Sequence, residues 1–165
     1  MIEKLKAALR SPSAGWTGPF LLSFAFLAPI LLALGWGGGL MRWDPQFDVT
    51  MIRLALIAML VPALGEELLF RAAVLPHPDD GALPLVPTAL SIALFVLWHP
   101  IQAPIYGGEF GAMMLNPWFL ASVAAVGFAC AHLYWKTRSI WPAVLLHWSV
   151  IMIWKALLDG PSPWS

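Results

Sequence analysis

The chain has 165 residues, of which 60% are hydrophobic and only 11% are charged. Soluble domains average about 25% charged residues, so this composition excludes an ordinary soluble domain and is typical of a polytopic membrane protein. Nine basic and nine acidic residues cancel without forming a basic stripe, which argues against nucleic acid as a partner. The single cysteine, Cys130, excludes an internal disulfide.

Apolar runs follow one another along most of the chain. They occupy residues 19–40, 51–75, 87–105, 117–135 and 140–158. Each run has roughly the 20 residues that a helix needs to cross ~30 Å of hydrocarbon. The sequence therefore predicts an all-α polytopic membrane helix bundle with about five transmembrane helices, in a single membrane domain over residues 1–165.

The segments between the runs are short and rich in polar residues, glycine and proline. Residues 1–15 are basic and predict an amphipathic helix on the membrane surface, retained as an anchor. Loops are expected at residues 42–50, 76–81 and 106–116, and a tight turn at 136–139. Lysine and arginine are more frequent on the side of the N-terminus, which favours a cytoplasmic N-terminus with five crossings. The expected location is the bacterial inner membrane.

The second apolar run is almost free of charge until its end, where Glu66, Glu67 and Arg71 occur together. Ionised groups at membrane depth are costly and persist only when they are paired, hydrated or functional. On a helix, Glu67 and Arg71 share a face and are well oriented for an ion pair. Glu66 is rotated by about 100° from Glu67, so Arg71 does not neutralise both carboxylates equally. One carboxylate can therefore serve the structure while the other is left for chemistry.

Two histidines lie inside later runs at a similar depth. Counted from the inner ends of the spans, Glu66, His99 and His147 lie about 9, 12 and 8 residues in, which corresponds to roughly 12–18 Å. Three ionisable groups on three helices thus share one level of the bilayer. This predicts that they converge on one site.

The order of these motifs along the chain is specific. Glu66-Glu67-x-x-x-Arg71 is followed by Phe95-x-x-x-His99, and His147 comes after Ser139-Ile140-Trp141-Pro142-Ala143. This ordered set on hydrophobic helices resembles the CAAX protease and bacteriocin-processing family, the intramembrane glutamic proteases also called the Abi family. The resemblance implies a four-helix catalytic core at residues 51–158, with residues 19–40 as an accessory first span.

The resemblance also implies three catalytic roles. Glu66 would be the general base that activates water, His99 would help to hold that water, and His147 would donate a hydrogen bond to the developing oxyanion. Peptide hydrolysis inside a bilayer needs these parts: a cavity that admits water, a positioned base, and a donor facing the oxygen that becomes negative.

Supporting roles follow from the same resemblance. Glu67 and Arg71 would brace their helix, and Phe95 would pack behind the histidine one turn later. The third motif of the family usually has Asn or Asp four residues after its histidine, where this chain has Ile151. Trp154, seven residues after that histidine, shares its face and is a candidate substitute donor. We therefore expect a protease with an altered or weaker oxyanion site.

The leading hypothesis is an intramembrane endopeptidase that needs no cofactor. Its partners would be the bilayer and a membrane-associated peptide or protein tail, lipid-modified if it follows relatives that act on prenylated CAAX tails. Zinc catalysis is a chemical alternative, but the HExxH motif is absent and adjacent glutamates diverge, so no metal is expected.

Two alternatives are not enzymes. A non-catalytic immunity or scaffold protein with the same fold is favoured by Ile151 and by the short chain. A proton- or ion-coupled carrier would also use intramembrane carboxylates, but five spans without an inverted repeat argue against a self-contained transporter.

Overall fold

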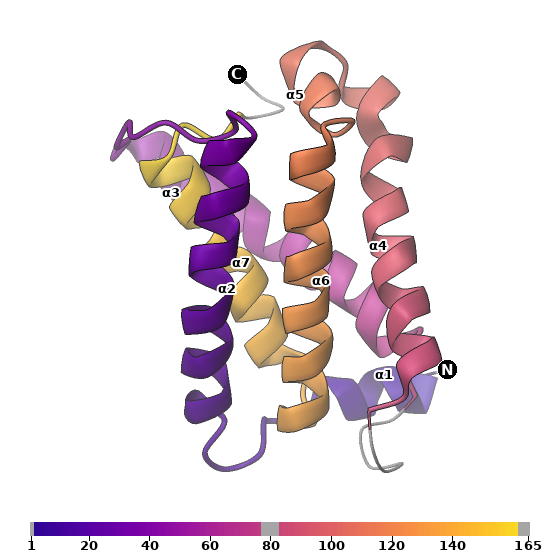
Figure 1. Ribbon diagram of the computed structural model, residues 1–165. Helices are drawn as coiled ribbons and strands as arrows, with labels where there is room; N and C mark the ends of the chain where they lie inside the picture. The colour runs from indigo at the N-terminus through magenta and orange to yellow at the C-terminus, as the bar shows by residue number, and fades with distance from the viewer. Residues whose placement is uncertain (1, 77–82, 162–165) are drawn as a thin grey trace.

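The computed structural model describes residues 2–76 and 83–161, and the regular structure in these ranges is helical. The helices are α1 (Ile2–Ala8), α2 (Thr17–Gly37), α3 (Val49–Ala58), α4 (Leu85–Tyr106), α5 (Gly108–Met113), α6 (Pro117–Thr137) and α7 (Trp141–Leu157). Two π-helical segments, η1 (Met59–Glu66) and η2 (Leu68–Ala72), continue α3 (Figure 1).

Four of the described helices are long and apolar enough to cross a membrane, and their bounds lie close to the predicted ones. They are Thr17–Gly37, Val49–Ala72, Leu85–Tyr106 and Pro117–Thr137. A shorter apolar helix of 17 residues, α7, packs among them. The predicted all-α bundle with about five spans is confirmed, and the protein is an integral membrane protein.

The central element of the bundle is α6, which packs against α2, α4 and α7 (Figure 1). Half of its apolar window is buried inside the protein, compared with 17% or less in the other three long spans. The remaining apolar surface of those spans faces outward, as expected of helices whose surroundings are lipid. The long helices of the bundle are therefore held together mainly through α6.

The second span departs from the regular α-helix that the sequence predicted. Pro62 lies inside it and has no N–H to donate, so the normal hydrogen-bond ladder is interrupted there. The helix widens over η1 and η2, and the Ala73 N–H donates to the Leu68 carbonyl, five residues back, at 3.0 Å. Such π-helical turns are rare and often lie at functional sites. Both glutamates of the motif lie on this widened stretch.

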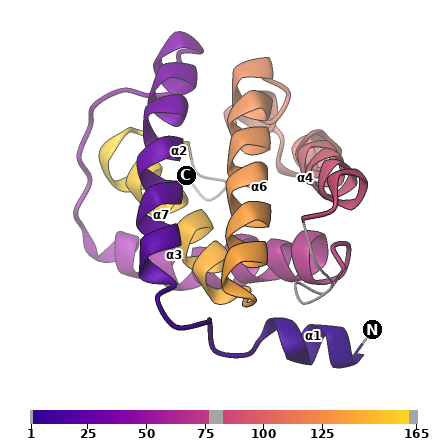
Figure 2. The same cartoon turned by 60° about the horizontal axis from the view of Figure 1, so that its bottom comes forward.

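The N-terminal segment and the turn between α6 and α7 meet at one end of the bundle. Figure 2 shows α1 lying across this end. The Ile140 N–H donates to the Ala8 carbonyl at 2.9 Å, and the Ser139 hydroxyl donates to the Arg10 carbonyl at 2.7 Å. The tight turn itself is present, with Arg138 in the left-handed conformation at φ 56°.

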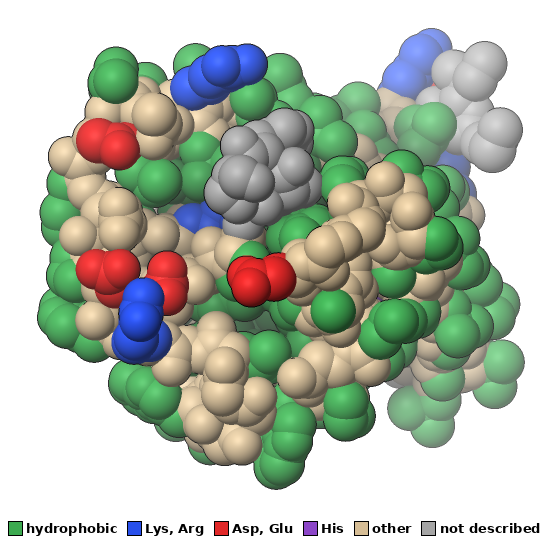
Figure 3. Space-filling view, turned by 90° about the horizontal axis from the view of Figure 1, so that it is seen from above, with side chains coloured by type: hydrophobic (Ala, Val, Ile, Leu, Met, Phe, Trp, Pro, Cys, Tyr) green, Lys and Arg blue, Asp and Glu red, His purple; other side chains and the backbone are tan. Residues whose placement is uncertain are grey.

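The opposite end carries the other two connections that the structure describes. Residues 42–50 run past the end of α7. There, Nη2 of Arg42 lies 2.8 Å from Oδ2 of Asp159, which forms an ion pair. Viewed from this end, charged side chains lie on the end face, while hydrophobic side chains surround it (Figure 3). The prediction of a loop at 106–116 is wrong in part, because Gly107 ends α4 at φ 62° and α5 follows at once. The predicted loop at 76–81 lies outside the described residues, except Pro76.

Candidate active site

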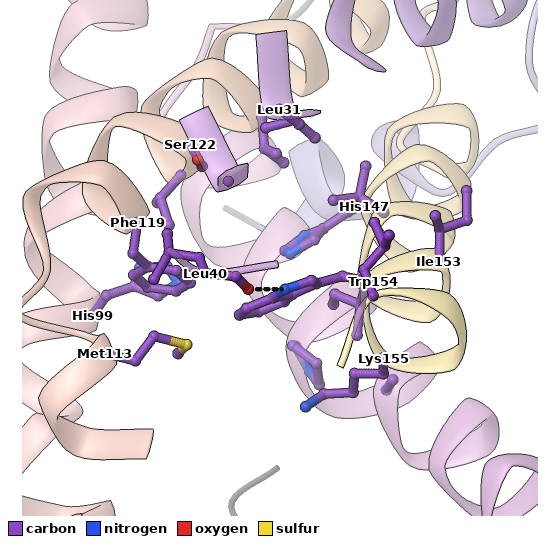
Figure 4. A pocket seen from close by; sticks show the side chains of 18 of the residues that line it. Leu31, Leu40, His99, Met113, Phe119, Ser122, His147, Ile153, Trp154 and Lys155 are labelled. Carbon is purple, nitrogen blue, oxygen red and sulfur yellow. Dashed lines mark hydrogen bonds between the residues drawn. The ribbon is translucent and has the colours of Figure 1, made fainter. Parts of the chain in front are cut away.

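The interior of the bundle contains a cavity of about 490 Å³. Glu66 from η1, His99 from α4 and His147 from α7 all line it, so the structure brings together the three residues that the sequence placed at one level. Figure 4 shows His99 on one side of the cavity and His147 on the other. From this level the lining continues to Leu40 and Phe110, toward the end of the bundle opposite α1.

One carboxylate oxygen of Glu66 accepts a hydrogen bond, and the other has no hydrogen-bond partner among the described residues. Its Oε1 accepts from the indole N–H of Trp98 at 3.2 Å. Its Oε2 is buried, has no hydrogen-bond partner among the described residues, and lies 3.9 Å from Nε2 of His147. An unpaired buried carboxylate oxygen is costly, and a cavity beside it gives room for a water molecule to satisfy it.

Glu67 does not line the cavity and points into the packed interior. Its side chain and that of Arg71 are fully buried, and Arg71 Nε lies 3.2 Å from Glu67 Oε2. The contact is an ion pair whose alignment is not that of a hydrogen bond. The other oxygen, Oε1, lies 3.0 Å from His147 Nδ1. The two adjacent carboxylates therefore contact His147 on its two different ring nitrogens.

Arg71 is held by the neighbouring helices as well as by its carboxylate partner. Its Nη2 donates to the Gly127 carbonyl of α6 at 3.1 Å, and its guanidinium lies 4.2 Å from the centre of the Phe95 ring. A Cβ at Gly127 would lie 3.3 Å from Arg71 Nη2 and 3.2 Å from the Phe95 ring, so a glycine allows this close approach. Phe95 thus packs on the arginine as well as behind His99, where the sequence placed it.

His99 is oriented by its own helix and by aromatic neighbours. Its Nδ1 lies 2.9 Å from the Phe95 carbonyl oxygen. A carbonyl only accepts, so Nδ1 carries the proton and Nε2 is left as an acceptor. Phe95 and Phe119 both contact the imidazole edge-on, with ring centres 5.2 and 5.4 Å away. A water molecule held by His99 would therefore donate to Nε2.

His147 has a different arrangement, because its Nδ1 faces a carboxylate. With Glu67 ionised against Arg71, Nδ1 must donate the proton. The neutral ring then has no proton on Nε2, so Nε2 donates to an oxyanion only when both ring nitrogens are protonated. Glu67 thus fixes the direction of the ring, as a carboxylate does for the histidine of a hydrolytic triad.

Trp154 is not free to act as the substitute donor that the sequence predicts. Trp154 lines the cavity, but its indole N–H donates to the Leu40 carbonyl at 3.0 Å instead of pointing into free space (Figure 4). Ile151 also lines the cavity and has no polar atom to offer. In this conformation neither residue replaces the second donor of the family motif.

Sequence reasoning missed two aromatic residues of the site. Trp98 lies within the third apolar run, where nothing in the sequence marks it as a site residue, although a buried indole N–H usually needs an acceptor and Glu66 is a carboxylate on the preceding span. Phe119 packs between His99 and Trp154, at ring-centre distances of 5.4 and 5.9 Å. No sequence signal distinguished Phe119 from an ordinary apolar residue of its span.

No group of three or more His, Cys, Asp or Glu side chains among the described residues is arranged to hold a metal ion. Within that part of the chain, His147 links the two glutamates and Arg71 pairs with Glu67, whereas His99 contacts the Phe95 carbonyl of its own helix. The chemistry of the site is therefore that of a carboxylate and two imidazoles beside an apolar cavity.

A protein-family model matches most of the chain. The model described as Rce1-like, type II CAAX prenyl endopeptidase, matches residues 48–153, well over half of the chain. No curated protein and no solved structure matches the chain. The matched range contains both glutamates, Arg71, His99 and His147. The protein belongs to the Rce1-like family of type II CAAX prenyl endopeptidases.

Proposed function

We propose that the protein is an intramembrane endopeptidase that hydrolyses a peptide bond of a membrane-associated peptide or protein tail. The observation that carries the proposal is the shared cavity of Glu66, His99 and His147, with Glu66 Oε2 buried and without a hydrogen-bond partner among the described residues. A general base, a water-orienting acceptor and a group that can stabilise an oxyanion are the parts that peptide hydrolysis requires.

In the proposed reaction, Glu66 Oε2 accepts a proton from water while the water oxygen attacks the peptide carbonyl carbon. His99 Nε2 accepts the second proton of that water in a hydrogen bond and so orients it. The carbonyl oxygen becomes an oxyanion, to which the doubly protonated His147 donates from Nε2. The proton on Glu66 then passes to the leaving amine as the C–N bond breaks, which yields a carboxylic acid and an amine. The acid then gives its remaining water-derived proton to the amine, so the final products are a carboxylate and an ammonium group.

Glu67 and Arg71 support this reaction from the packed side of the cavity. Glu67 holds His147 through Nδ1, while Arg71 balances the charge of Glu67. Removing either group disturbs the ring that faces the reacting atoms. Both are therefore positioning residues.

The test is cleavage of hydrophobic peptides by the purified full chain in detergent micelles, with products identified by mass spectrometry. Glu66→Gln keeps the shape of the side chain but removes the base, so the cleavage rate falls by about 10³-fold or more. His99→Phe and His147→Phe also lower the rate. Wild-type cleavage by Glu66→Gln would contradict the proposal.

A chelator separates this mechanism from metal catalysis. The glutamate mechanism predicts that cleavage survives strong chelation while Glu66→Gln remains inactive. Loss of activity on chelation, with recovery on adding zinc, would instead assign the reaction to a metal.

A second candidate function, a non-catalytic membrane immunity or scaffold protein, is favoured by Ile151. The family motif has a donor at this position, and the side chain here is apolar and lines the cavity. Complementation separates the two functions. A binding protein keeps its cellular function as Glu66→Gln, whereas an endopeptidase loses it.

The apolar lining of the cavity and the family description support a lipid-modified tail as substrate.

The orientation of the protein in the membrane follows from its basic residues. Lys6, Arg10 and Lys136 lie near the end that carries α1, which supports a cytoplasmic N-terminus in a bacterial inner membrane. A cysteine introduced at Lys136 is then labelled from the cytoplasmic side only, and one introduced at Glu109 from the opposite side. The native Cys130 is buried and gives a low background.

A further inference from the structure

One buried cation in the cavity has no part in the proposed reaction. Lys155 near the end of α7 lines the cavity and is only 9% exposed. It is the one lysine or arginine among the described lining residues. In the same described ranges no carboxylate lies within ion-pair distance of its ammonium. A charge at such a place is costly unless it has a use.

The hydrogen-bonding capacity of the Lys155 ammonium is only partly used by the described residues around it. The ammonium donates to the carbonyl of Pro161 and lies 5.6 Å and 5.7 Å from the ring centres of Phe110 and Trp154. An ammonium has three donors, so two remain for other acceptors. A lysine near the end of a membrane helix commonly extends to the lipid headgroups, yet the side chain of Lys155 is mostly buried and its ammonium lies beside two aromatic rings. The arrangement is that of a cation kept for an anionic ligand.

The distance to the reacting groups suggests which anion. Lys155 follows His147 by eight residues on α7, which is about 12 Å along the helix axis. An extended peptide advances about 3.3–3.6 Å per residue, so three to four residues cover this distance. A peptide whose last carboxylate lies at Lys155 would place a bond three or four residues earlier beside Glu66 and His147.

We propose that Lys155 binds the free C-terminal carboxylate of the peptide substrate and so selects chain ends over internal segments. This inference rests on the proposed endopeptidase function, because it names the substrate group that the cavity recognises at the end distant from Glu66. Lys155 is then a specificity-determining residue. The apolar wall between the two charged ends holds the side chains of the intervening residues.

The test measures binding rather than cleavage, so it does not depend on the proposed reaction. The full-length Glu66→Gln chain in micelles is titrated with two fluorescent hydrophobic hexapeptides, identical except for a free carboxylate or an amide at the C-terminus. We expect the acid to bind about tenfold more tightly or better, because a hydrogen bond to a charged group contributes on that scale. Lys155→Met removes this preference by weakening the acid alone, and Lys155→Arg keeps it. Lys136→Met, an exposed lysine at the other end of the bundle, also keeps it.

Three outcomes overturn the inference. Equal binding of acid and amide to the Glu66→Gln chain would mean that no carboxylate is recognised. Equal weakening of both peptides by Lys155→Met would assign the lysine a structural role, in holding Pro161. Displacement of both peptides alike by anionic phosphatidylglycerol vesicles, with no acid preference, would assign the site to a lipid phosphate. Failure of the wild type to cleave either peptide would contradict the proposed function, whereas the binding result stands by itself.

Discussion

The interior of the bundle is built differently on the two sides of the Glu66–Glu67 pair. On the side of α1 its residues form the main hydrophobic core cluster, and Cys130, Leu133 and Tyr134 are fully buried there. On the other side the same helices surround a cavity of about 490 Å³. Adjacent residues of one helix thus face two environments, and on this difference we base the proposal that Glu67 is structural and Glu66 reactive.

The packed region gives the largest expected effect. Arg71→Met leaves the Glu67 charge buried without its counter-ion, and breaking a buried pair in this way costs about 3–5 kcal/mol. That is a large share of a typical folding free energy of about 5–15 kcal/mol. We expect the variant to lose most of its folded protein, measured by thermal unfolding in micelles. Arg53→Met, an exposed arginine on α3, serves as the control and changes little.

The double variant Glu67→Gln with Arg71→Met sharpens this prediction. It removes both charges, so no uncompensated ion remains and part of the lost stability returns. A double variant less stable than Arg71→Met alone would show that the pair does not act as a unit.

On the cavity side, we expect one substitution to increase the activity. Ile151→Asn places an amide on the face of α7 that lines the cavity, where it adds a donor for the oxyanion. One such donor is commonly worth ~10²–10³ in rate, and we expect kcat to rise by about tenfold to 10²-fold. Ile151→Leu is the apolar control. Unchanged kcat in the asparagine variant would mean that a missing second donor does not limit the proposed reaction.

Trp98 lies where the packed region meets the cavity, and we expect a smaller effect from its substitution. Trp98→Phe removes the donor to Glu66 Oε1, so the carboxylate is less well positioned. We expect kcat to fall by about tenfold with the melting temperature nearly unchanged. Trp148→Phe is the matched control, since that indole donates to the Ala55 carbonyl at 2.9 Å, away from the cavity. It should lower stability but not kcat, and the reverse pattern would remove Trp98 from the site.

The smallest effect is expected at the start of α3, outside the membrane span. The Asp48 carboxylate accepts from the Thr50 hydroxyl and from two backbone N–H groups, and the Thr50 contact is the main reason that its pKa is lowered. A lowered folded-state pKa means that the cap stabilises above the ordinary aspartate range and is lost as the pH falls through the folded-state value. The melting temperature of Asp48→Ala should therefore be slightly lower than wild type at neutral pH. The two should converge in strong acid, and a difference that grows in acid would contradict this account.

The spans and the convergence of the site could be predicted from the sequence, because both depend on local properties. Apolar runs give the helices, and counting along them puts Glu66, His99 and His147 at one depth. The π-helical widening depends on how the stretch after Pro62 packs, which a regular helical count does not contain. The Trp98 donor and the cavity beyond His147 arise from contacts between distant helices.

The role of the first span also could not be predicted from the sequence. Residues 19–40 were expected to be accessory, and the family match begins only at residue 48. In the structure Leu27 and Leu31 of α2 nevertheless line the cavity. Apolar residues that close a wall look the same in sequence as those that face lipid, so only the three-dimensional packing distinguishes them.

The most direct test of the account compares the two adjacent glutamates in one experiment. Peptide cleavage and thermal unfolding are measured for Glu66→Gln and Glu67→Gln in the same micelles. The account predicts that Glu66→Gln abolishes cleavage and keeps the wild-type melting temperature, whereas Glu67→Gln lowers the melting temperature markedly. Glu66→Gln protein that cleaves at the wild-type rate would contradict the assignment of Glu66 as the base.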